Sequence, residues 1–231
     1  MGPKISIIIP VLNEAKDITR TLSALQPLRA KGHEVIVVDG GSDDATAPLS
    51  QTLSDQVISS LRGRARQMNA GARVAKGDVF LFLHADTQLP NEADTQITER
   101  LERERKDWGH FDVTLSGNHP LLPLIGCLMN WRTRLTGIAT GDQATFVRRD
   151  LFEKVGGFPE IELMEDIALS KVLKGHGPPL SLRDSVKTSS RRWEKNGILR
   201  TVFLMWRLRL LYFLGLSPER LARIYEGQRS R

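Results

Sequence analysis

Short apolar runs alternate with longer stretches of mixed polarity over the first hundred residues of the chain. Three of these runs, the first, second and fourth, consist almost entirely of β-branched or other apolar residues, as strands buried on both faces of a sheet do. The predicted strands cover residues 4–10, 34–39, 56–60 and 78–83.

The stretches between these strands predict helices, and three of them are entered through a polar residue that can cap a helix. The predicted helices cover residues 14–30, 43–54, 64–76 and 91–106, with Asn13, Asp43 and Asn91 as the candidate caps. Alternating strands and helices are typical of a parallel sheet with right-handed crossover connections. We therefore predict an α/β fold, a mostly parallel sheet flanked by helices.

After residue 110 the alternation becomes looser, and we expect this second half to complete a site by covering one edge of the sheet. The predicted elements are strands near 110–115 and 143–148, an apolar helix near 121–136, a helix over 165–174 and a last helix over 194–215. The helix over 165–174 should end at Gly175, since glycine is a common helix stop.

Polar residues and glycines follow each predicted strand. In open parallel α/β sheets, ligands bind outside the carboxyl ends of the strands, so these residues should meet at one edge. They are Pro10, Asn13 and Glu14, then Asp39, Gly40, Gly41, Ser42, Asp43 and Asp44, then Arg62 and Arg64, and finally His84, Ala85 and Asp86. Carboxylates, glycines and arginines together suit a ligand with a base, a ribose and phosphates, accompanied by a metal ion.

Some of these residues have simpler explanations when they are considered singly. Asp39 and Gly40 alone could form a turn, and Asp43 alone could cap a helix. Asp86 is different, because an acid directly after a buried strand serves no packing purpose. The combination therefore indicates a nucleotide site more strongly than any one member does.

Two common nucleotide-binding folds are excluded by the segment after the first strand, which reads PVLNEAKD. A dinucleotide-binding Rossmann unit needs GxGxxG there, and a P-loop needs GxxxxGK[ST]. A nucleotidyltransferase that builds nucleotide sugars would be expected to have a phosphate loop rich in glycine and Lys or Arg at the same place. It remains an alternative, as does a non-catalytic nucleotide-binding or membrane-associated protein.

Charge and cysteine content indicate which partners and which cellular compartment to expect. The 33 Lys and Arg against 27 Asp and Glu leave a net charge of +6, which favours anionic partners. These basic residues are scattered and are not interleaved with aromatics, so nucleic acid is not an expected partner. One cysteine, Cys127, excludes an internal disulfide, and no secretory leader is recognised, so we expect a reducing, cytoplasmic location.

SIIIPVLNEA, VIVVDGGSDDAT, FLHADT and MED, taken in this order, resemble the motifs of family 2 glycosyltransferases of the GT-A fold. The resemblance covers residues 4–195, so we expect a catalytic domain over 1–195 and a C-terminal helical extension over 196–231. GRARQMNAGA, GDQATFVRR and SRRW further resemble the branch associated with radical-SAM or arsenosugar gene neighbourhoods. The resemblance implies an enzyme that transfers a sugar from a nucleotide sugar, usually linked to UDP, to a hydroxyl group of an acceptor.

The resemblance also implies a donor site. Its nucleotide-binding residues would be Pro10, Asn13, Glu14, Asp39, Gly41, Arg64, Gln67, Asn69, His84, Ala85 and Asp86. In the family, a DXD motif binds Mn²⁺ or Mg²⁺ between the two phosphates, and here it reads His84-Ala85-Asp86. Asp86 is therefore the implied metal ligand, and His84 could either ligate a metal or donate to the nucleotide.

On the acceptor side, Glu165 and Asp166 match an ED pair whose Asp is the general base of inverting enzymes; a helix N-cap is the alternative. Retaining enzymes share the fold and the metal motif, so inversion depends on Asp166 alone. The remaining implied residues, near the sugar, the acceptor or the diphosphate, are Gly141, Asp142, Gln143, Arg191, Arg192 and Trp193. Ser189 replaces the Gln of the QxxRW segment, so a processive polymerase is not expected.

The last predicted helix, ILRTVFLMWRLRLLYFLGL, is amphipathic. Arg200, Arg207 and Arg209 interrupt its apolar run, which disfavours a membrane-spanning helix. Two interpretations remain. The helix could be a buried amphipathic cover of the domain, or it could lie at a lipid surface with Phe203, Trp206 and Tyr212 among the headgroups and the arginines on anionic lipids. The second would place the protein on the inner face of a membrane and suit a lipid-linked acceptor, whereas the first leaves a small-molecule acceptor equally open.

Overall fold

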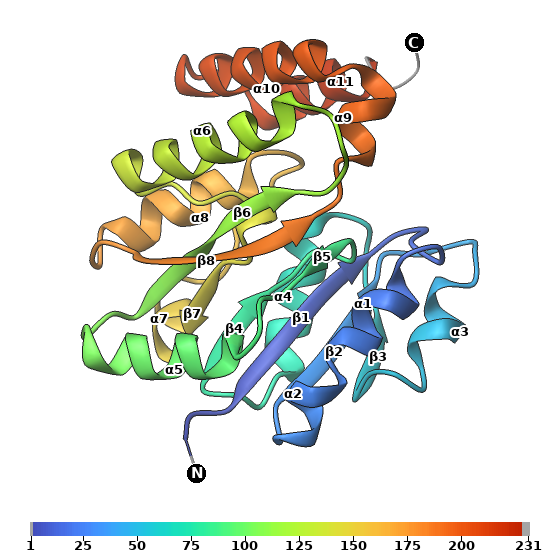
Figure 1. Ribbon diagram of the computed structural model, residues 1–231, viewed down its shortest axis with the longest axis vertical. Coiled ribbons are helices and arrows are strands. Elements are labelled where there is room, and N and C mark those ends of the chain that lie inside the picture. Colours follow the sequence, from blue (N-terminus) through green and yellow to red (C-terminus); the bar gives the residue numbers. More distant parts are fainter. Residues whose placement is uncertain (1, 228–231) are drawn as a thin grey trace.

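Eight strands form one sheet in the computed structural model, which describes residues 2–227 apart from the side chains of Arg192 and Asn196 (Figure 1). The strand order is β3-β2-β1-β4-β7-β6-β8-β5. The strands are β1 (Ile5–Val11), β2 (Glu34–Asp39), β3 (Gln56–Ser59), β4 (Val79–Phe82), β5 (Thr87–Gln88), β6 (Trp108–Leu115), β7 (Phe146–Arg148) and β8 (Leu180–Thr188). An α/β fold with a largely parallel sheet, as predicted, is confirmed.

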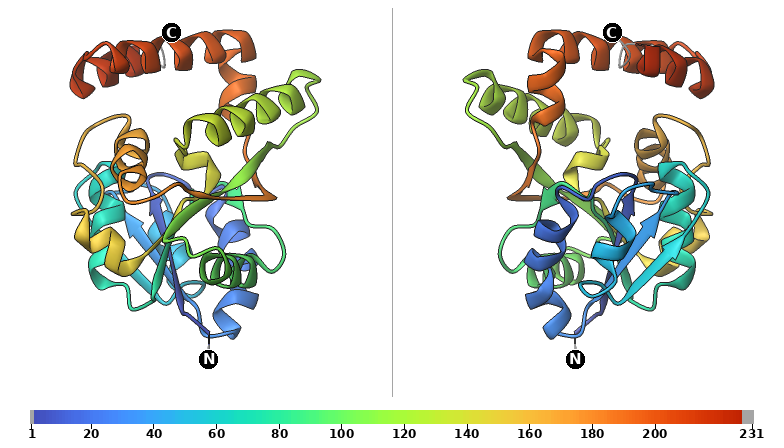
Figure 2. Two further views of the ribbon diagram at one scale, coloured as in Figure 1. Left: turned by 90° about the vertical axis from the view of Figure 1, so that its left-hand side faces the viewer. Right: turned by 90° about the vertical axis from the view of Figure 1, so that its right-hand side faces the viewer.

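The helices lie on both faces of this sheet and at one end of the molecule (Figure 2). They are α1 (Ile18–Ala24), α2 (Gln26–Ala30), α3 (Thr46–Ser50), α4 (Arg64–Val74), α5 (Ala93–Arg103), α6 (Leu121–Thr136), α7 (Arg149–Lys154), α8 (Glu165–Lys174), α9 (Arg191–Asn196), α10 (Ile198–Phe213) and α11 (Pro218–Gly227). A short 3-10 helix, η1 (Gly141–Gln143), precedes β7.

The first half of the sheet is parallel: β1 pairs with β2 and with β4, and β2 pairs with β3. The second half does not cover an edge, as we had expected, but continues the sheet. There β7 pairs antiparallel with both β4 and β6, β8 pairs parallel with β6, and β5 pairs antiparallel with β8. The sequence analysis missed β8 because Arg183 and Asp184 interrupt its apolar positions, whereas in the sheet they are exposed and Leu182 and Val186 are buried.

Two predicted helices are shorter or divided. The stretch 14–30 forms α1 and α2, and Pro27 lies in the first turn of α2, where its missing N–H costs no hydrogen bond. The expected caps are also wrong, since α1, α3 and α5 begin after Asp17, Ala45 and Glu92, none of which makes a side-chain cap. Asn13 and Asp43 instead join the loops after β1 and β2, whereas Asn91 O accepts a hydrogen bond from Gln96 of α5.

Two apolar layers bury the faces of the sheet. On one face α1, α2 and α5 pack with residues such as Ile18, Leu22 and Ile97. On the other face α4, α7 and α8 pack around Met68 and Phe152. Nearly every residue of β1, β2 and β4 is buried, which agrees with the continuous apolar runs of the sequence.

The C-terminal helices α9, α10 and α11 lie beyond α6 at the end of the molecule opposite the N-terminus (Figures 1 and 2). The single helix predicted over 194–215 is broken at Gly197, whose φ of 83° favours glycine. Ile198 packs α10 against α6, and Leu208 packs it against the start of α8. None of the helices within residues 2–227 has both the length and the apolar character needed to cross a bilayer.

The interpretation of α10 as a cover of the domain is only half correct. Its buried positions are Ile198, Thr201 and Leu208. Its other side is exposed and apolar, through Leu199, Phe203, Trp206, Leu210 and Phe213. The helix therefore covers the domain with one side and presents hydrophobic side chains on the other.

Close packing of α4 against the sheet depends on Gly71. A Cβ atom at this position would lie 2.4 Å from Ile8 Cγ2 and 3.0 Å from Val38 Cγ2. Both neighbours are β-branched and fully buried, so neither can move aside easily. The residue thus sets how near α4 comes to β1 and β2.

We predict that Gly71→Ala lowers the free energy of unfolding by about 1–2 kcal/mol. Overpacking a core costs about 1–3 kcal/mol, and the higher helix propensity of alanine returns at most about 1 kcal/mol. Urea unfolding measures the difference. Gly227→Ala in α11, where nothing lies within 4 Å of the added Cβ, is the control and should not be destabilised. Equal stability of Gly71→Ala and the wild type would contradict the prediction.

Candidate active site

The loops after β1 and β2 are held together by side-chain hydrogen bonds. Asn13 N donates to Ser42 Oγ at 2.9 Å, and Asp43 N donates to Asn13 Oδ1 at 3.0 Å. Ser42 Oγ in turn donates to Asp39 Oδ1 at 2.5 Å, in a turn where Gly41 has a φ of 91°. Asp43 is therefore not a helix cap, and the two loops form one prearranged edge with Asp39 beneath it.

Pro10 lies within β1, although proline is rare in central strands. The last residue of β1 paired with β4 is Ile8, opposite Phe82, so Pro10 comes after that pairing has ended. Its missing N–H therefore removes no hydrogen bond to β4. Pro10 is half-buried at the carboxyl end of the strand, where the predicted nucleotide base would lie.

Two predicted nucleotide-binding residues of α4 have main-chain partners instead. Gln67 Nε2 donates to Val11 O and to Val38 O, both at 2.8 Å, and so joins the ends of β1 and β2. Asn69 accepts from Phe158 N and donates to Phe158 O, both at 2.9 Å. These contacts give both amides a structural role, so we do not assign Gln67 and Asn69 to the donor site.

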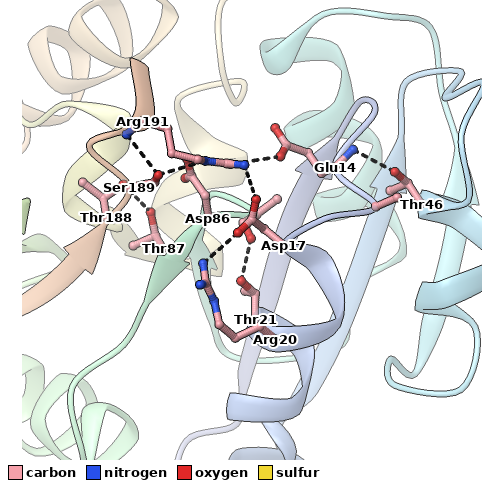
Figure 3. Close-up of polar contacts among 12 residues, drawn as sticks. Glu14, Asp17, Arg20, Thr21, Thr46, Asp86, Thr87, Thr188, Ser189 and Arg191 are labelled. Carbon is pink, nitrogen blue, oxygen red and sulfur yellow. Dashed lines mark hydrogen bonds and ion pairs between the residues drawn. The ribbon is translucent and has the colours of Figure 1, made fainter. Parts of the chain in front are cut away.

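Arg191, the first residue of α9, extends over the carboxyl ends of β1 and β4 (Figure 3). It forms an ion pair with Asp17, and its Nη2 lies 3.8 Å from Glu14 Oε2 and 3.9 Å from Asp86 Oδ2. Ser189 Oγ accepts a hydrogen bond from Arg191 Nε at 3.0 Å. Arg20 Nη2 also pairs with Asp17 Oδ1 at 2.8 Å, so two guanidinium groups lie among these three carboxylates. Asp86, whose contact with Arg191 is the longest of the three, can accept a further cation.

The segment His84-Ala85-Asp86 divides its contacts between two neighbours. Thr21 Oγ1 of α1 donates to Ala85 O at 2.5 Å, which fixes the main chain between the two functional side chains. His84 Nδ1 lies 3.4 Å from both Asp142 Oδ1 and Arg64 Nη2. His84 therefore contacts η1 and α4, whereas Asp86, 29% exposed, contacts Arg191.

Glycine is required at position 141 because of His84. A Cβ atom on Gly141 would lie 2.5 Å from His84 Nε2 and 2.6 Å from His84 Cε1. The main chain of the same residue is also used, since Gly141 N donates to Asp166 Oδ2 at 2.9 Å. Gly141 therefore connects His84, which follows β4, with the start of α8.

Asp166 lies in the first turn of α8, and its carboxylate is oriented by main-chain N–H groups. Oδ2 accepts from Gly141 N, and Oδ1 accepts from Ile167 N at 2.7 Å. A carboxylate can accept about four hydrogen bonds, so lone pairs remain for a hydroxyl group. The N-cap interpretation of this pair is wrong, because the N-cap is Met164 and both acids follow it inside the helix.

Glu165, beside it, is only 5% exposed. Burial and the negative charge of Asp166, opposed by the positive charge of Arg64, together raise the pKa of Glu165 to about 7. Arg64 Nη1 lies 3.9 Å from Glu165 Oε1. Near neutral pH this carboxyl group can therefore be neutral or charged.

The remaining predicted residues on the acceptor side have mixed roles. Gln143 is buried, and its Oε1 accepts from Thr133 Oγ1 at 2.8 Å and from Thr140 N at 3.2 Å, so it holds η1 in place. Trp193 packs with the apolar cluster between α6 and α10 rather than facing the acidic edge. The side chain of Arg192 lies outside the described part of the chain.

Sequence analysis missed three charged residues at this site. Asp17, which pairs with Arg191, was read as part of a helix. Arg132 of α6 and Arg209 of α10 both lie where the charges of Asp142 and Asp166 act on them. A signal for the two arginines existed, because each interrupts an otherwise apolar helix that contains no acid.

The chain is similar to known proteins over most of its length. Residues 6–156 match the family described as Glycosyl transferase family 2. A Pseudomonas fluorescens undecaprenyl-phosphate 4-deoxy-4-formamido-L-arabinose transferase is 32% identical over 162 residues, which are 62% of this chain and 46% of that protein. A Staphylococcus aureus poly-beta-1,6-N-acetyl-D-glucosamine synthase is 26% identical over 188 residues, 72% of this chain and 44% of that protein. The chain thus spans less than half the length of either relative.

Solved structures support the fold. S. aureus TarS 1–349 in complex with UDP-GlcNAc matches with a TM-score of 0.65 and 19% sequence identity, covering 81% of this chain and 59% of that chain. At such low identity the likeness concerns the fold alone. It confirms the predicted GT-A architecture.

We predict that the raised pKa of Glu165 makes stability depend on pH. Between its ordinary pKa of 4.5 and about 7, the folded state keeps a proton that the unfolded state has released. Stability should therefore fall as pH rises through 7, and Glu165→Gln, which cannot ionise, should lose less. Urea unfolding at pH 5 and pH 8 measures this. Glu162→Gln, at an exposed position, is the control and should follow the wild type. Parallel profiles for Glu165→Gln and the wild type would rule out the assignment.

Proposed function

The chain belongs to glycosyltransferase family 2 and is a glycosyltransferase, and from this membership we propose that it moves a sugar from a UDP-sugar to an acceptor hydroxyl with inversion. The observation that carries the proposal is the arrangement of two acidic centres at one edge of the sheet. Asp86 lies with Arg191 on one side, and Asp166 is held against Gly141 on the other. A donor diphosphate and an acceptor need these two kinds of groups respectively.

The proposed donor site is the joined loop edge after β1 and β2, followed by Arg191. Asp39 and the neighbouring main chain would bind the base and the ribose, and Glu14 and Arg64 would lie beside the ribose and diphosphate. UDP is favoured because the structural neighbour TarS was solved with UDP-GlcNAc. Arg191 lies beside three carboxylates, and when the donor binds, its guanidinium can exchange these partners for oxygens of the diphosphate.

The donor set fits a divalent cation of the Mn²⁺ or Mg²⁺ type at Asp86. Such hard cations take carboxylate oxygens together with substrate phosphates and waters, and the described residues hold no ready group of three His, Cys, Asp or Glu ligands. Asp86 would thus hold the cation together with the donor diphosphate, and the cation would supply positive charge for the negative charge that develops on the leaving group. Because His84 already contacts Asp142 and Arg64, we assign the metal to Asp86 alone.

Asp166 is the proposed general base. Its two main-chain hydrogen bonds fix the carboxylate, so an acceptor hydroxyl can approach one remaining lone pair and lose its proton during attack on the anomeric carbon. Glu165 would support it, because a neutral Glu165 lessens the negative charge crowded around Asp166. Attack from the side opposite the leaving diphosphate gives inversion.

We predict that two substitutions separate binding from turnover. Asp86→Ala should lose the gain in UDP affinity that Mn²⁺ provides, at least about tenfold, since a hydrogen bond or contact to a charged group is worth about 1.5–3 kcal/mol. Asp166→Asn should keep that affinity and lose about 10²–10⁴ in the rate of UDP release from UDP-GlcNAc. Calorimetry and a UDP assay measure the two effects.

Asp184→Asn, an exposed position on β8, is the control for both measurements. The metal assignment fails if wild-type UDP affinity is the same with and without Mn²⁺. The base assignment fails if Asp166→Asn releases UDP as fast as the wild type does.

We also propose that the domain over 1–195 carries the chemistry and that the extension over 196–231, together with α6, places it on an anionic lipid surface. Both α6 and α10 present exposed hydrophobic side chains at helical spacing, including Trp131 at 62% and Trp206 at 69% exposure. This exposed apolar face comprises Leu124, Leu128, Trp131 and Leu135 of α6 with Leu199, Phe203, Trp206, Leu210, Phe213 and Leu214 of the C-terminal region.

Charge favours lipid over a protein partner on this face. Neither α6 nor α10 contains Asp or Glu, whereas exposed Arg134, Arg200 and Arg207 lie on the same two helices. An apolar side with flanking arginines and no acids is typical of helices that lie in the headgroup region of anionic membranes. A lipid-linked acceptor, as the name of the Pseudomonas fluorescens relative indicates for that protein, would suit this placement.

We predict that the protein floats with vesicles containing phosphatidylglycerol and much less with pure phosphatidylcholine. Phe203→Ser with Trp206→Ser should reduce partitioning more than tenfold, because burial of each large side chain contributes about 1.5–3 kcal/mol. Leu61→Ser, which removes a 75% exposed leucine far along the chain from this face, is the control. Absence of lipid-dependent flotation by the wild type would end the membrane proposal and leave the transferase proposal intact.

A further inference from the structure

Arg132 lies in the last part of α6, directly before a residue that supports the acceptor side of the site. That residue, Thr133, is buried and donates to Gln143 of η1, the short helix that also contains Asp142. Arg132 Nη2 donates to Thr133 Oγ1 at 2.9 Å. Within the described residues its Nε is buried and has no hydrogen-bond partner. The guanidinium is thus partly buried, and its hydrogen-bonding groups are only partly satisfied.

Arg209 approaches the same place from α10. Leu208, the preceding residue, is completely buried and packs with Met164 and Ile167, which flank the Glu165–Asp166 pair. Arg209 is itself half-buried. Within the described residues, no hydrogen bond or ion pair joins the Arg209 side chain to another group, so α10 brings a cation to the start of α8 without a partner for it.

The two arginines affect one another and the nearby acids. Burial and the positive charge of Arg209, opposed by Asp166 and Asp142, together lower the pKa of Arg132 to about 10. Burial lowers the pKa of Arg209 in the same way. Two partly dehydrated like charges at one place are unfavourable, and buried polar groups without partners are rare in folded proteins. An anion between them would satisfy both.

We propose that Arg132 and Arg209 bind a phosphate group of the acceptor, beside the hydroxyl that Asp166 deprotonates. The inference deepens the proposed function and rests on it. Guanidinium groups match the oxygens of phosphate and of carboxylate, but a phosphate with a charge of about −1.5 to −2 neutralises both arginines, whereas a carboxylate neutralises one. Arg191 is separate from this site, because its partners are Glu14, Asp17 and Asp86.

This site also explains why the arginines of α10 face two ways. Arg200 and Arg207 are exposed on the helix, while Arg209 is half-buried, where the charges of Asp142 and Asp166 act on it. If all three arginines served only to attract anionic lipid, the partial burial of an unpaired Arg209 would destabilise the fold and add nothing to lipid binding. The phosphate can come from a lipid-linked acceptor at the exposed apolar face or from a free phosphorylated small molecule.

The test uses full-length protein saturated with UDP and Mg²⁺, so that the donor site is filled, at constant ionic strength. Inorganic phosphate is titrated into the wild type, Arg132→Gln, Arg209→Gln and the control Arg73→Gln, which removes the same charge from an exposed position on α4. The wild type and the control should bind phosphate equally. Each of the other two variants should bind about tenfold to a hundredfold more weakly, as loss of a charged hydrogen bond predicts.

The melting temperature of each variant without phosphate shows whether weaker phosphate binding merely results from unfolding. Arg209→Gln removes an unpaired and partly buried charge, so its melting temperature should equal or exceed that of the wild type. Arg132→Gln also loses the hydrogen bond to Thr133, so its melting temperature should stay near that of the wild type. In both variants the stabilisation by phosphate should disappear. Equal phosphate affinity of the wild type and both variants overturns the proposal. So does an absence of phosphate binding by the UDP-loaded wild type.

Two further measurements identify the source of the phosphate and keep the proposals distinct. Farnesyl phosphate that binds more than tenfold tighter than inorganic phosphate, with no binding of farnesol, supports a lipid-linked acceptor; equal affinities support a small phosphorylated one. UDP affinity should be unchanged in both arginine variants. If the wild type fails to bind UDP but still binds phosphate through these arginines, the donor proposal fails and the phosphate site stands.

Discussion

The parallel pairing of β1 with β2 on one side and β4 on the other is the constraint on which the rest of the structure depends. It places the loops after three strands at the same edge of the sheet, and these loops hold Asp39, His84 and Asp86. Gln67 strengthens the arrangement by donating to the last carbonyl groups of β1 and β2. Burial of nearly all residues in these strands makes the edge rigid, so the loops need little ordering when a ligand binds.

Opposite charges at this edge are arranged in two groups. Arg191 gathers Glu14, Asp17 and Asp86, while Arg64, Arg132 and Arg209 surround Asp142, Glu165 and Asp166. Neither group is internally complete: in the first, Asp86 has only a 3.9 Å contact with Arg191, and in the second, the Arg209 side chain has no partner among the described residues. Such incomplete compensation is costly for stability and is typical of sites that bind charged ligands. The pattern agrees with a donor that brings a cation and an acceptor that brings an anion.

Much of the fold could be predicted from the sequence, and the failures have physical causes. The predicted bounds of β2, α6 and α8 agree with the structure, because these elements have strong apolar patterns and clear ends. The pattern failed at β8, where polar residues are tolerated since the strand lies near the edge of the sheet. It also failed at the helix caps, because Asn13 and Asp43 form hydrogen bonds between two loops that are 30 residues apart in sequence.

The candidate site was predicted in part. Family resemblance placed Asp86 and the Glu165–Asp166 pair at this edge, and Asp86 and Asp166 there have the partners described above. Three amide residues were also expected at the ligand, namely Gln67, Asn69 and Gln143, but they bind other parts of the protein. A motif gives only the residue type, so it does not show whether a side-chain amide binds a ligand or the protein itself. The assignment to a radical-SAM-associated branch stays a prediction.

By itself, the sequence determined the alternating strands and helices of the first hundred residues, the GT-A fold and the family, because these follow from apolar periodicity and from motifs that are contiguous in the chain. Only the tertiary structure decided which arginine serves which site. Arg191 reaches Asp86 across 105 residues of chain, and Arg209 is separated from the exposed Arg207 by one residue yet faces Asp166. The physical reason is that a charge is a property of the residue, whereas its partner depends on how the sheet and the last helices pack.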